Sequence, residues 1–116
     1  MYINAHGTGT HMNDSIETMA IKKALGEERA REALISSTKS MTGHMLGAAG
    51  AIECIVCALS LSRGVIFPTI HLDEPDPECD LNYVPNAALE LQADAALSVS
   101  LGFGGHNAVI ALRRCV

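Results

Sequence analysis

The feature that most limits what this chain of 116 residues can fold into is an apolar run at residues 45–62. It lies in the segment GHMLGAAGAIECIVCALSLSRG, which is apolar nearly all round and predicts one long helix closed by Arg63 and Gly64. Such a helix must be covered on most of its sides. Because Glu53 interrupts the run and no signal-like segment opens the chain, we expect a cytoplasmic protein without a membrane span.

Strand-like and helix-like segments alternate before this run. YINAHG predicts a short strand that ends in a turn, and a second short strand is predicted around residues 34–37. Between them, NDSIETMAIKKALGEE predicts a helix with Asn13 or Asp14 as its N-cap and Gly26 near its end.

The C-terminal part of the chain predicts a loop and a hairpin. VIFPTIHLDEPDPECDLNYVPNAA is rich in Pro, Asp and Asn, which indicates an extended surface connection with one short strand at 68–72. Two β-prone runs, 95–101 and 107–113, are joined by a glycine-rich turn and predict a β-hairpin.

These elements predict an α/β protein with a layered, mixed sheet. Hydrophobic residues make up 48% of the chain and aromatic residues only 3%, so the core must consist of small and branched aliphatic side chains. A small sheet with one helix that is apolar on all sides leaves too much apolar surface for an independent domain. We therefore expect residues 1–116 to form a single partial domain of something larger.

Composition and spacing argue against several classes of function. The net charge is −5 without a cluster of Lys and Arg, which argues against nucleic acid as a partner. Cys54 and Cys57 have C-x-x-C spacing, but a pair three residues apart within an apolar helix is typical of small buried side chains. Cys79 and Cys115 complete no tetrahedral set with them, so we expect four reduced thiols and no zinc site.

Glycine and histidine patterns give no cofactor or metal site either. GTGTHM and GFGGHN lack the third glycine of a dinucleotide fingerprint, and the second leads into a strand instead of a helix. None of the five histidines has the i, i+4 pairing of a helical zinc site. We expect no metal.

Polar residues at loop tips remain as the candidates for a site. His6 follows the first strand, Lys39 and His44 follow the second, and Phe103 lies in GFGG. Strand ends meet at one edge of an open α/β sheet, where ligands bind. A single histidine after a strand is as well explained by a turn, but two of them favour a site. A charged lysine beside a dry helix is costly unless another group pairs with it.

Four segments together resemble a known family. NAHGTGT, SSTKSMTGHMLGAAGAIE, PTIHLDEPDPECDLNYVP and SLGFGGHNAVI look, in this order and spacing, like the C-terminal part of a β-ketoacyl-acyl-carrier-protein synthase. The likeness is greatest to the bacterial elongation enzymes of fatty-acid synthase II. It implies the C-terminal half of a thiolase-like layered fold, with a mixed sheet, one long buried helix and a C-terminal β-hairpin.

The resemblance implies a decarboxylating Claisen condensation, in which a malonyl thioester loses carbon dioxide and the carbanion attacks an acyl thioester. His6 and His44 match the two imidazoles that donate to the thioester oxygen, where enolate charge develops. Lys39 matches the lysine of the family's TKS motif, and Glu53 matches the carboxylate that pairs with it and helps to orient the histidines.

Further positions match by the same resemblance. Phe103 corresponds to the gating loop, whose backbone N–H forms half of an oxyanion hole, and Gly104 and Gly105 let that loop move near the substrate. Thr8 and Thr10 correspond to threonines that hydrogen-bond the pantetheine arm.

The resemblance also implies partners. The substrates are carried on the phosphopantetheine of acyl carrier protein, no cofactor is needed, and the full protein is expected to be a homodimer. The acyl-accepting cysteine lies in the family's N-terminal half, which is absent here, so this chain alone is expected to be inactive. Asp14 and Glu17 match acidic residues that have a structural, supporting role in the family. The favourable interaction of negative charge with the first turn of a helix is enough to explain them.

Two positions depart from the family, and two other functions stay open. Val99 stands where Asn is common, in a patch that with Asn4 and Glu53 can hold a structural cation, and His106 stands where many relatives have Thr. A polyketide-type ketosynthase is one alternative, although ND after NAHGTGTHM, instead of GD, favours fatty-acid elongation. A non-catalytic module that binds acyl groups or carrier protein is the other.

Overall fold

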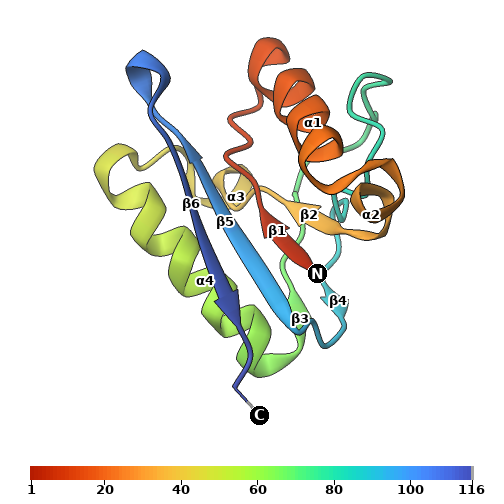
Figure 1. Ribbon diagram of the computed structural model, residues 1–116, viewed down its shortest axis with the longest axis vertical. Helices are drawn as coiled ribbons and strands as arrows, with labels where there is room; N and C mark the ends of the chain where they lie inside the picture. Colours follow the sequence, from red (N-terminus) through yellow and green to blue (C-terminus); the bar gives the residue numbers. More distant parts are fainter. Residues whose placement is uncertain (116) are drawn as a thin grey trace.

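The fold is a mixed four-stranded sheet with helices on both faces, described by a computed structural model for residues 1–115 (Figure 1). The strand order is β2 (Leu34–Ser36), β1 (Tyr2–Asn4), β5 (Ala95–Leu101) and β6 (Asn107–Arg113). β1 pairs in parallel with both β2 and β5, and β5 and β6 form an antiparallel hairpin. The α/β class, the mixed sheet and the C-terminal hairpin predicted from sequence are confirmed.

Helices cover the two faces of the sheet. α1 (His11–Leu25) and α2 (Glu27–Glu32) lie on one face, and α4 (Ala49–Arg63) lies on the other. The short elements are α3 (Lys39–Thr42), η1 (Leu46–Ala48), η2 (Phe103–Gly105), β3 (Val65–Ile66) and β4 (Leu89–Glu90). β3 and β4 form a separate two-stranded sheet.

Alternation along β1 divides the core in two. Tyr2 packs with Cys57 and Leu61 of α4, whereas the next residue, Ile3, packs with Ile21 of α1 on the opposite face. Both β1 residues are fully buried, as expected for a central strand whose two faces are covered by helices.

The long helix forms as predicted, but it begins later and is less covered. η1 precedes it, α4 starts at Ala49, and within this chain only one stripe of α4 is buried, while Ile55 is 55% exposed. By length and composition alone, Leu46–Arg63 would also fit a membrane-crossing helix. In this fold, however, Glu53 and Cys57 of the same helix face the interior and α4 packs along β5.

Three local predictions are wrong. α1 begins at His11 because the Thr10 side chain accepts the Asn13 N–H (3.3 Å), so neither Asn13 nor Asp14 is the N-cap. The single helix predicted over NDSIETMAIKKALGEE is in fact two, because α1 ends at Leu25 and α2 begins at Glu27, directly after Gly26. No strand forms at 68–72 in the described structure, where Thr69 makes an isolated bridge to Pro85.

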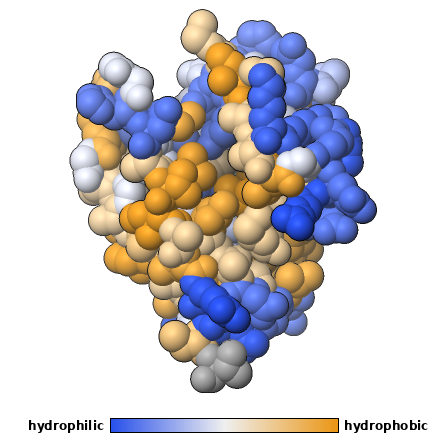
Figure 2. Space-filling model, viewed as in Figure 1, coloured by the Kyte–Doolittle hydropathy of each residue, from blue (hydrophilic) through white to orange (hydrophobic). Residues whose placement is uncertain are grey.

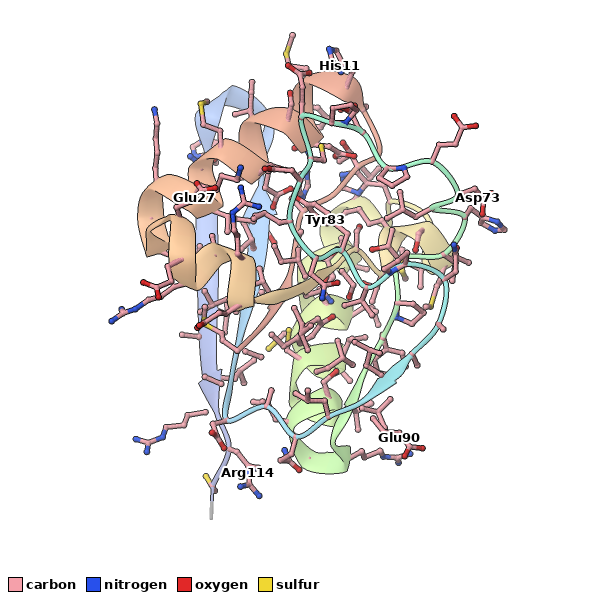
Figure 3. All side chains as sticks on the ribbon, turned by 90° about the vertical axis from the view of Figure 1, so that its right-hand side faces the viewer. His11, Glu27, Asp73, Tyr83, Glu90 and Arg114 are labelled. Carbon is pink, nitrogen blue, oxygen red and sulfur yellow. The ribbon has the colours of Figure 1, made fainter. Side chains whose placement is uncertain are left out.

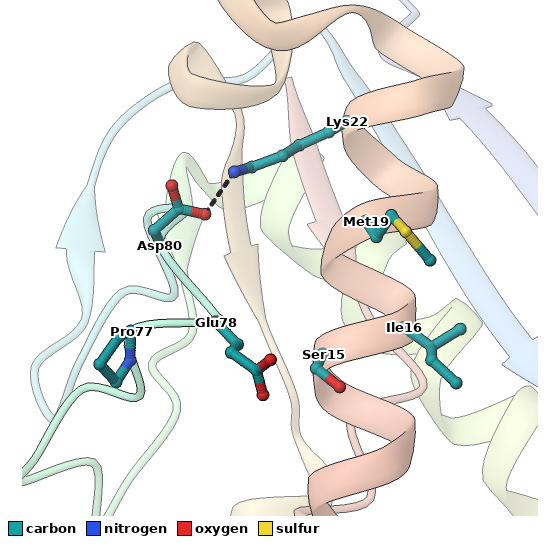
Figure 4. Close-up of a pocket in the computed structure, with 7 residues that line it drawn as sticks. All are labelled: Ser15, Ile16, Met19, Lys22, Pro77, Glu78 and Asp80. Atoms are coloured by element: carbon teal, nitrogen blue, oxygen red, sulfur yellow. Dashed lines mark ion pairs between the residues drawn. The ribbon is translucent and has the colours of Figure 1, made fainter.

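Residues 67–88, here called the wrapping connection, run along the sheet edge and beside α1 (Figure 3). Asp80 anchors this segment by an ion pair to Lys22 of α1 (Figure 4). A second ion pair joins Asp80 to Arg31 of α2. The two cations hold the pKa of the Asp80 carboxyl at about 2. The wrapping connection is thus fixed to the helical layer.

Hydrophobic side chains gather in the middle of one face of the molecule, with hydrophilic ones around them (Figure 2). Val109 and Ile110 of β6 are 58% and 47% exposed, and Phe103 at the hairpin tip is 90% exposed. All four cysteines are free thiols, as predicted, and burial raises the pKa of Cys57 to about 12.

Candidate active site

A cavity of about 1030 Å³ lies where β1 and β2 end. The turns that follow these two parallel strands form one wall, and the wrapping connection forms the opposite wall. Several of the residues singled out in the sequence line it: Thr8, Thr10, Asp14, Glu17, Lys39 and His44. The carboxyl edge of the sheet therefore carries the cavity, in keeping with the general behaviour of open α/β sheets.

The structure brings His6 and His44 together at the edge of this cavity, which His44 lines and His6 does not. The ring centroids are 5.4 Å apart and the planes meet at 84°, in an edge-to-face arrangement. His6 follows β1 and is 8% exposed, whereas His44 follows α3 and lines the cavity. Two turns that are far apart in sequence thus place two imidazoles side by side.

A backbone hydrogen bond fixes which nitrogen of His44 carries hydrogen. The Leu46 N–H donates to His44 Nδ1 at 3.1 Å, so Nδ1 acts as an acceptor. A neutral imidazole with an acceptor at Nδ1 has its hydrogen at Nε2. Leu46 holds this position with a left-handed backbone (φ 51°), which is unfavourable for a leucine. This contact therefore leaves Nε2 as the nitrogen of His44 that can donate.

His6 is kept neutral by its surroundings. Burial lowers its pKa, and the nearby Lys39 and His44 lower the pKa further. Its Nδ1 is buried without a hydrogen-bond partner among the described residues. A buried polar atom of this kind indicates a group that is meant to bind something outside the chain.

Lys39 and Glu53 form a buried ion pair beside the histidines. Lys39 begins α3 and Glu53 lies on the inner side of α4, and their side chains are only 5% and 3% exposed. The pairing offsets the desolvation of both charges, which would be prohibitive for either one alone. It also ties the turn after β2 to the helix on the far side of the sheet.

Asn4 Oδ1, at the end of β1, and Glu53 Oε2, on α4, are buried oxygens without hydrogen-bond partners among the described residues. Oxygens are the ligands that hard cations prefer, but such ions take six or more of them. Val99 offers no oxygen from its side chain and packs beside the apolar cluster around Ile21. These side chains do not make a cation cage, and the absence of a metal stays a prediction.

Asp14 and Glu17 do more than favour the helix N-terminus, which corrects the interpretation drawn from sequence. The Glu17 carboxylate accepts the backbone N–H groups of His6 (2.8 Å) and Gly7 (2.9 Å), and Asp14 Oδ1 accepts that of Gly9 (3.3 Å). Glu17 is 5% exposed. The first two turns of α1, through Asp14 and Glu17, therefore hold the turn that carries His6.

Gly7 lets this turn approach the next one closely. Its φ is 41°, and a Cβ at this position would lie 2.7 Å from Ser37 Oγ. Ser37 in turn donates from Oγ to the Gly7 carbonyl at 2.6 Å. Only glycine fits between the two turns without displacing one of them.

Thr8 and Thr10 lie at the cavity, whereas Phe103 at the hairpin tip does not. Thr8 and Thr10 line the cavity and their hydroxyls hydrogen-bond each other at 3.1 Å. Phe103 does not line it and projects from the tip of the β5–β6 hairpin, where Gly104 (φ 74°) and Gly105 (φ 83°) adopt left-handed backbone. The structure does not bring Phe103 to the histidines.

Sequence reasoning missed some residues at the cavity. Tyr83 lines the wall formed by the wrapping connection, and its hydroxyl contacts Thr18 of α1. His11 lies between Asp76 (3.9 Å) and Glu78 (3.7 Å), with a different ring nitrogen toward each carboxylate. No sequence periodicity marks these residues, because Tyr83, Asp76 and Glu78 lie on the irregular wrapping connection and His11 lies at the start of α1.

Comparison with known proteins gives concordant matches. A model of the family described as "Beta-ketoacyl synthase, C-terminal domain" matches residues 1–73. The tetracenomycin polyketide synthase ketoacyl synthase alpha subunit of Streptomyces glaucescens is 55% identical over 97% of this chain and 26% of its own length. The 3-oxoacyl-[acyl-carrier-protein] synthase 2 of Synechocystis is 53% identical over 97% of this chain and 27% of its own.

Solved structures agree with these matches. One is a type II polyketide acyl-carrier protein in complex with its ketosynthase (AntDE:AntF), with a TM-score of 0.95 and 45% identity over 99% of this chain and 28% of that one. Another is a β-ketoacyl synthase from Burkholderia phymatum, with a TM-score of 0.90 and 39% identity over 99% and 28%. The chain thus spans about a quarter of the length of the proteins that it matches.

Proposed function

The chain belongs to the β-ketoacyl synthase family, in which it corresponds to the C-terminal domain, and we propose that it supplies the two-histidine half of a condensing active site. The observation that carries the proposal is the adjacent pair His6 and His44, whose ring centroids are 5.4 Å apart at the edge of the cavity, with Nε2 of His44 left as a donor by the Leu46 N–H on its Nδ1. Two neutral N–H donors can stabilise negative charge on an oxygen without giving up a proton.

The chemistry proposed for this pair is the decarboxylation of a malonyl thioester. The bond between the carboxylate and the α-carbon breaks, carbon dioxide leaves, and the electron pair passes into an enolate whose oxygen accepts both imidazole N–H groups. The α-carbon then attacks the acyl thioester carbonyl, a carbon–carbon bond forms, and the thiolate leaves. Lys39 and Glu53 position the turn that carries His44, and the buried ion pair between them supports this role.

The remaining components are proposed to come from outside this chain. The acyl group would be carried on a cysteine of the other half of the synthase, which is the expected partner, together with acyl carrier protein, in a cytoplasmic homodimer that uses no cofactor. We propose that Phe103 and its glycines reach the site in that assembly as a gate, and that Thr8 and Thr10 bind the pantetheine arm from the cavity wall that they line.

We propose fatty-acid elongation as the pathway. A polyketide ketosynthase is the second candidate, because relatives of both kinds are equally similar to this chain, at 53% and 55% identity. Product analysis with the complete synthase, malonyl-loaded carrier protein and an acyl primer separates the two. A single extension per cycle supports elongation, whereas repeated condensation without reduction supports the polyketide assignment.

The catalytic proposal is tested by substituting His6→Ala and His44→Ala separately in the complete synthase and measuring malonyl decarboxylation. Each variant is expected to lose at least about a hundredfold in rate, the size reported for removing one oxyanion donor. His106→Thr is the control, since this histidine lies at the hairpin tip. Near-normal decarboxylation in both alanine variants would contradict the proposal, and binding of carrier protein without any turnover would favour a non-catalytic module.

A further inference from the structure

Tyr83 links the wrapping connection to helix α1 through its hydroxyl group. The residue lies on the wrapping connection beside α1 and lines the cavity (Figure 3). Its Oη contacts Oγ1 of Thr18, a residue of α1 that is only 1% exposed. Hydrogen bonds from a buried partner of this kind are expected to be retained, because leaving one unmade is costly.

The direction of this hydrogen bond follows from the second contact of Thr18. Thr18 Oγ1 donates its only hydrogen to the Asp14 carbonyl oxygen at 2.7 Å. Tyr83 must therefore donate to Thr18, and its own proton is firmly held, since burial raises the pKa of Tyr83 to about 12. The hydroxyls of Tyr83 and Thr18 and the Asp14 carbonyl form one directed chain.

This chain ends at the turn of α1 that holds the His6 turn. Asp14 receives the Gly9 N–H through its carboxylate, and Glu17, the neighbour of Thr18 in sequence, receives the N–H groups of His6 and Gly7. A contact made on the wrapping connection is therefore two hydrogen bonds away from the residues that fix the His6 backbone.

We propose that Tyr83 is a positioning residue for His6, acting through Thr18 and the part of α1 that contains Asp14 and Glu17. The inference rests on the proposed function, because it assigns Tyr83 to the donor geometry of the two-histidine site.

The test uses three variants of the complete synthase: Tyr83→Phe, Thr18→Val and the double variant. Each removes one oxygen with little change in shape. We expect kcat for malonyl decarboxylation to fall about three- to tenfold in each single variant, the range for one lost hydrogen bond, with KM changed less than about twofold. The double variant should be no slower than the worse single one, because both substitutions break the same chain.

Tyr2→Phe is the matched control. It removes the other buried tyrosine hydroxyl, which bonds Ser36 Oγ at 2.9 Å away from the cavity lining, and should leave kcat unchanged. A second readout does not depend on turnover: amide exchange in residues 5–9 should quicken in Tyr83→Phe and Thr18→Val but not in Tyr2→Phe.

The outcomes separate this inference from the proposed function. If the unmodified synthase decarboxylates malonyl thioester but Tyr83→Phe keeps full kcat and normal exchange at residues 5–9, the positioning role is wrong and the two-histidine site stands. A rise in KM alone, or losses that add in the double variant, would also overturn it. A synthase that never decarboxylates malonyl thioester contradicts the proposed function itself.

Discussion

The ion pair between Lys39 and Glu53 is the costliest arrangement at the level of single residues. Both side chains are almost fully buried, and one carboxylate oxygen of Glu53 has no partner among the described residues. A buried pair of this kind contributes little net stability, but removing one partner leaves an uncompensated charge. What the pair does in this structure is join the start of α3 to the buried side of α4.

Glu53→Gln should consequently destabilise the fold strongly. We expect the free energy of unfolding to fall by about 3–5 kcal/mol, measured by urea denaturation, because Lys39 is left buried without a counter-charge. Adding Lys39→Met should restore a large part of this loss. Glu90→Gln, at an exposed position, is the control, and an equal loss in that variant would contradict the explanation.

The pH dependence of stability should depend on His6. Its pKa is lowered in the folded state by burial and by Lys39, so the unfolded chain binds more protons as pH falls below the ordinary value of about 6.5. Stability is thus complete above that pH and decreases below it. Unfolding measured between pH 7.5 and 5 should show a smaller decrease in His6→Gln, and an unchanged pH profile would show that His6 titrates normally.

At the level of elements, the site depends on how closely the turns after β1 and β2 approach each other. Gly7→Ala should push these turns apart, since a Cβ would collide with the Ser37 side chain, and Gly9→Ala is the matched control. Gly9 also has a left-handed backbone (φ 77°), but nothing lies within 4 Å of an added Cβ.

Gly9→Ala should cost only the backbone strain, about 1–2 kcal/mol, and Gly7→Ala clearly more. Thermal unfolding of both variants provides the measurement. Equal losses would mean that strain alone, and not the approach of the turns, makes glycine necessary at position 7.

Much of this element arrangement could be predicted from the sequence because local patterns determine it. The hairpin strands were predicted with the bounds that the structure shows, since alternation and a glycine-rich turn leave few alternatives. Capping was less predictable: Thr10, Asn13 and Asp14 are all good N-caps, and only the Asn13 N–H direction selects Thr10.

The site was predictable where polar residues follow strands and where a family pattern marks them. His6, Lys39, His44 and Glu53 were singled out together by resemblance, and the structure brings them together. Tyr83 and Thr18 are 65 residues apart on elements of different kinds, so no local signal connects them. The clamp made by Glu17 was likewise hidden, because an acid in a first helical turn has a sufficient explanation without it.

For the molecule as a whole, exposed apolar surface is the main liability. Ile55 and Leu59 of α4 are 55% and 38% exposed, although this helix was expected to be covered on most sides. Chains with such surface associate with themselves or bind hydrophobic dyes.

Ile55→Lys and Leu59→Lys should reduce dye binding and self-association of residues 1–116 without lowering the midpoint of thermal unfolding by more than a few degrees. Light scattering and dye fluorescence provide the measurements. Leu61→Lys, at a position that is 4% exposed, is the contrasting variant and should unfold the chain. Unchanged self-association in the two surface variants would show that the surface responsible does not include Ile55 and Leu59.

The central position of β1 has a consequence for the order of events during folding. Tyr2 of β1 pairs with Ala96 of β5, so the sheet cannot close until β5 is available to pair with β1. Pairings between such distant residues must overcome a large loss of chain entropy before they are stabilised, which makes them slow. The turn that bears His6 therefore acquires its final shape late in folding, and until β5 pairs with β1 one edge of that strand stays open to other chains.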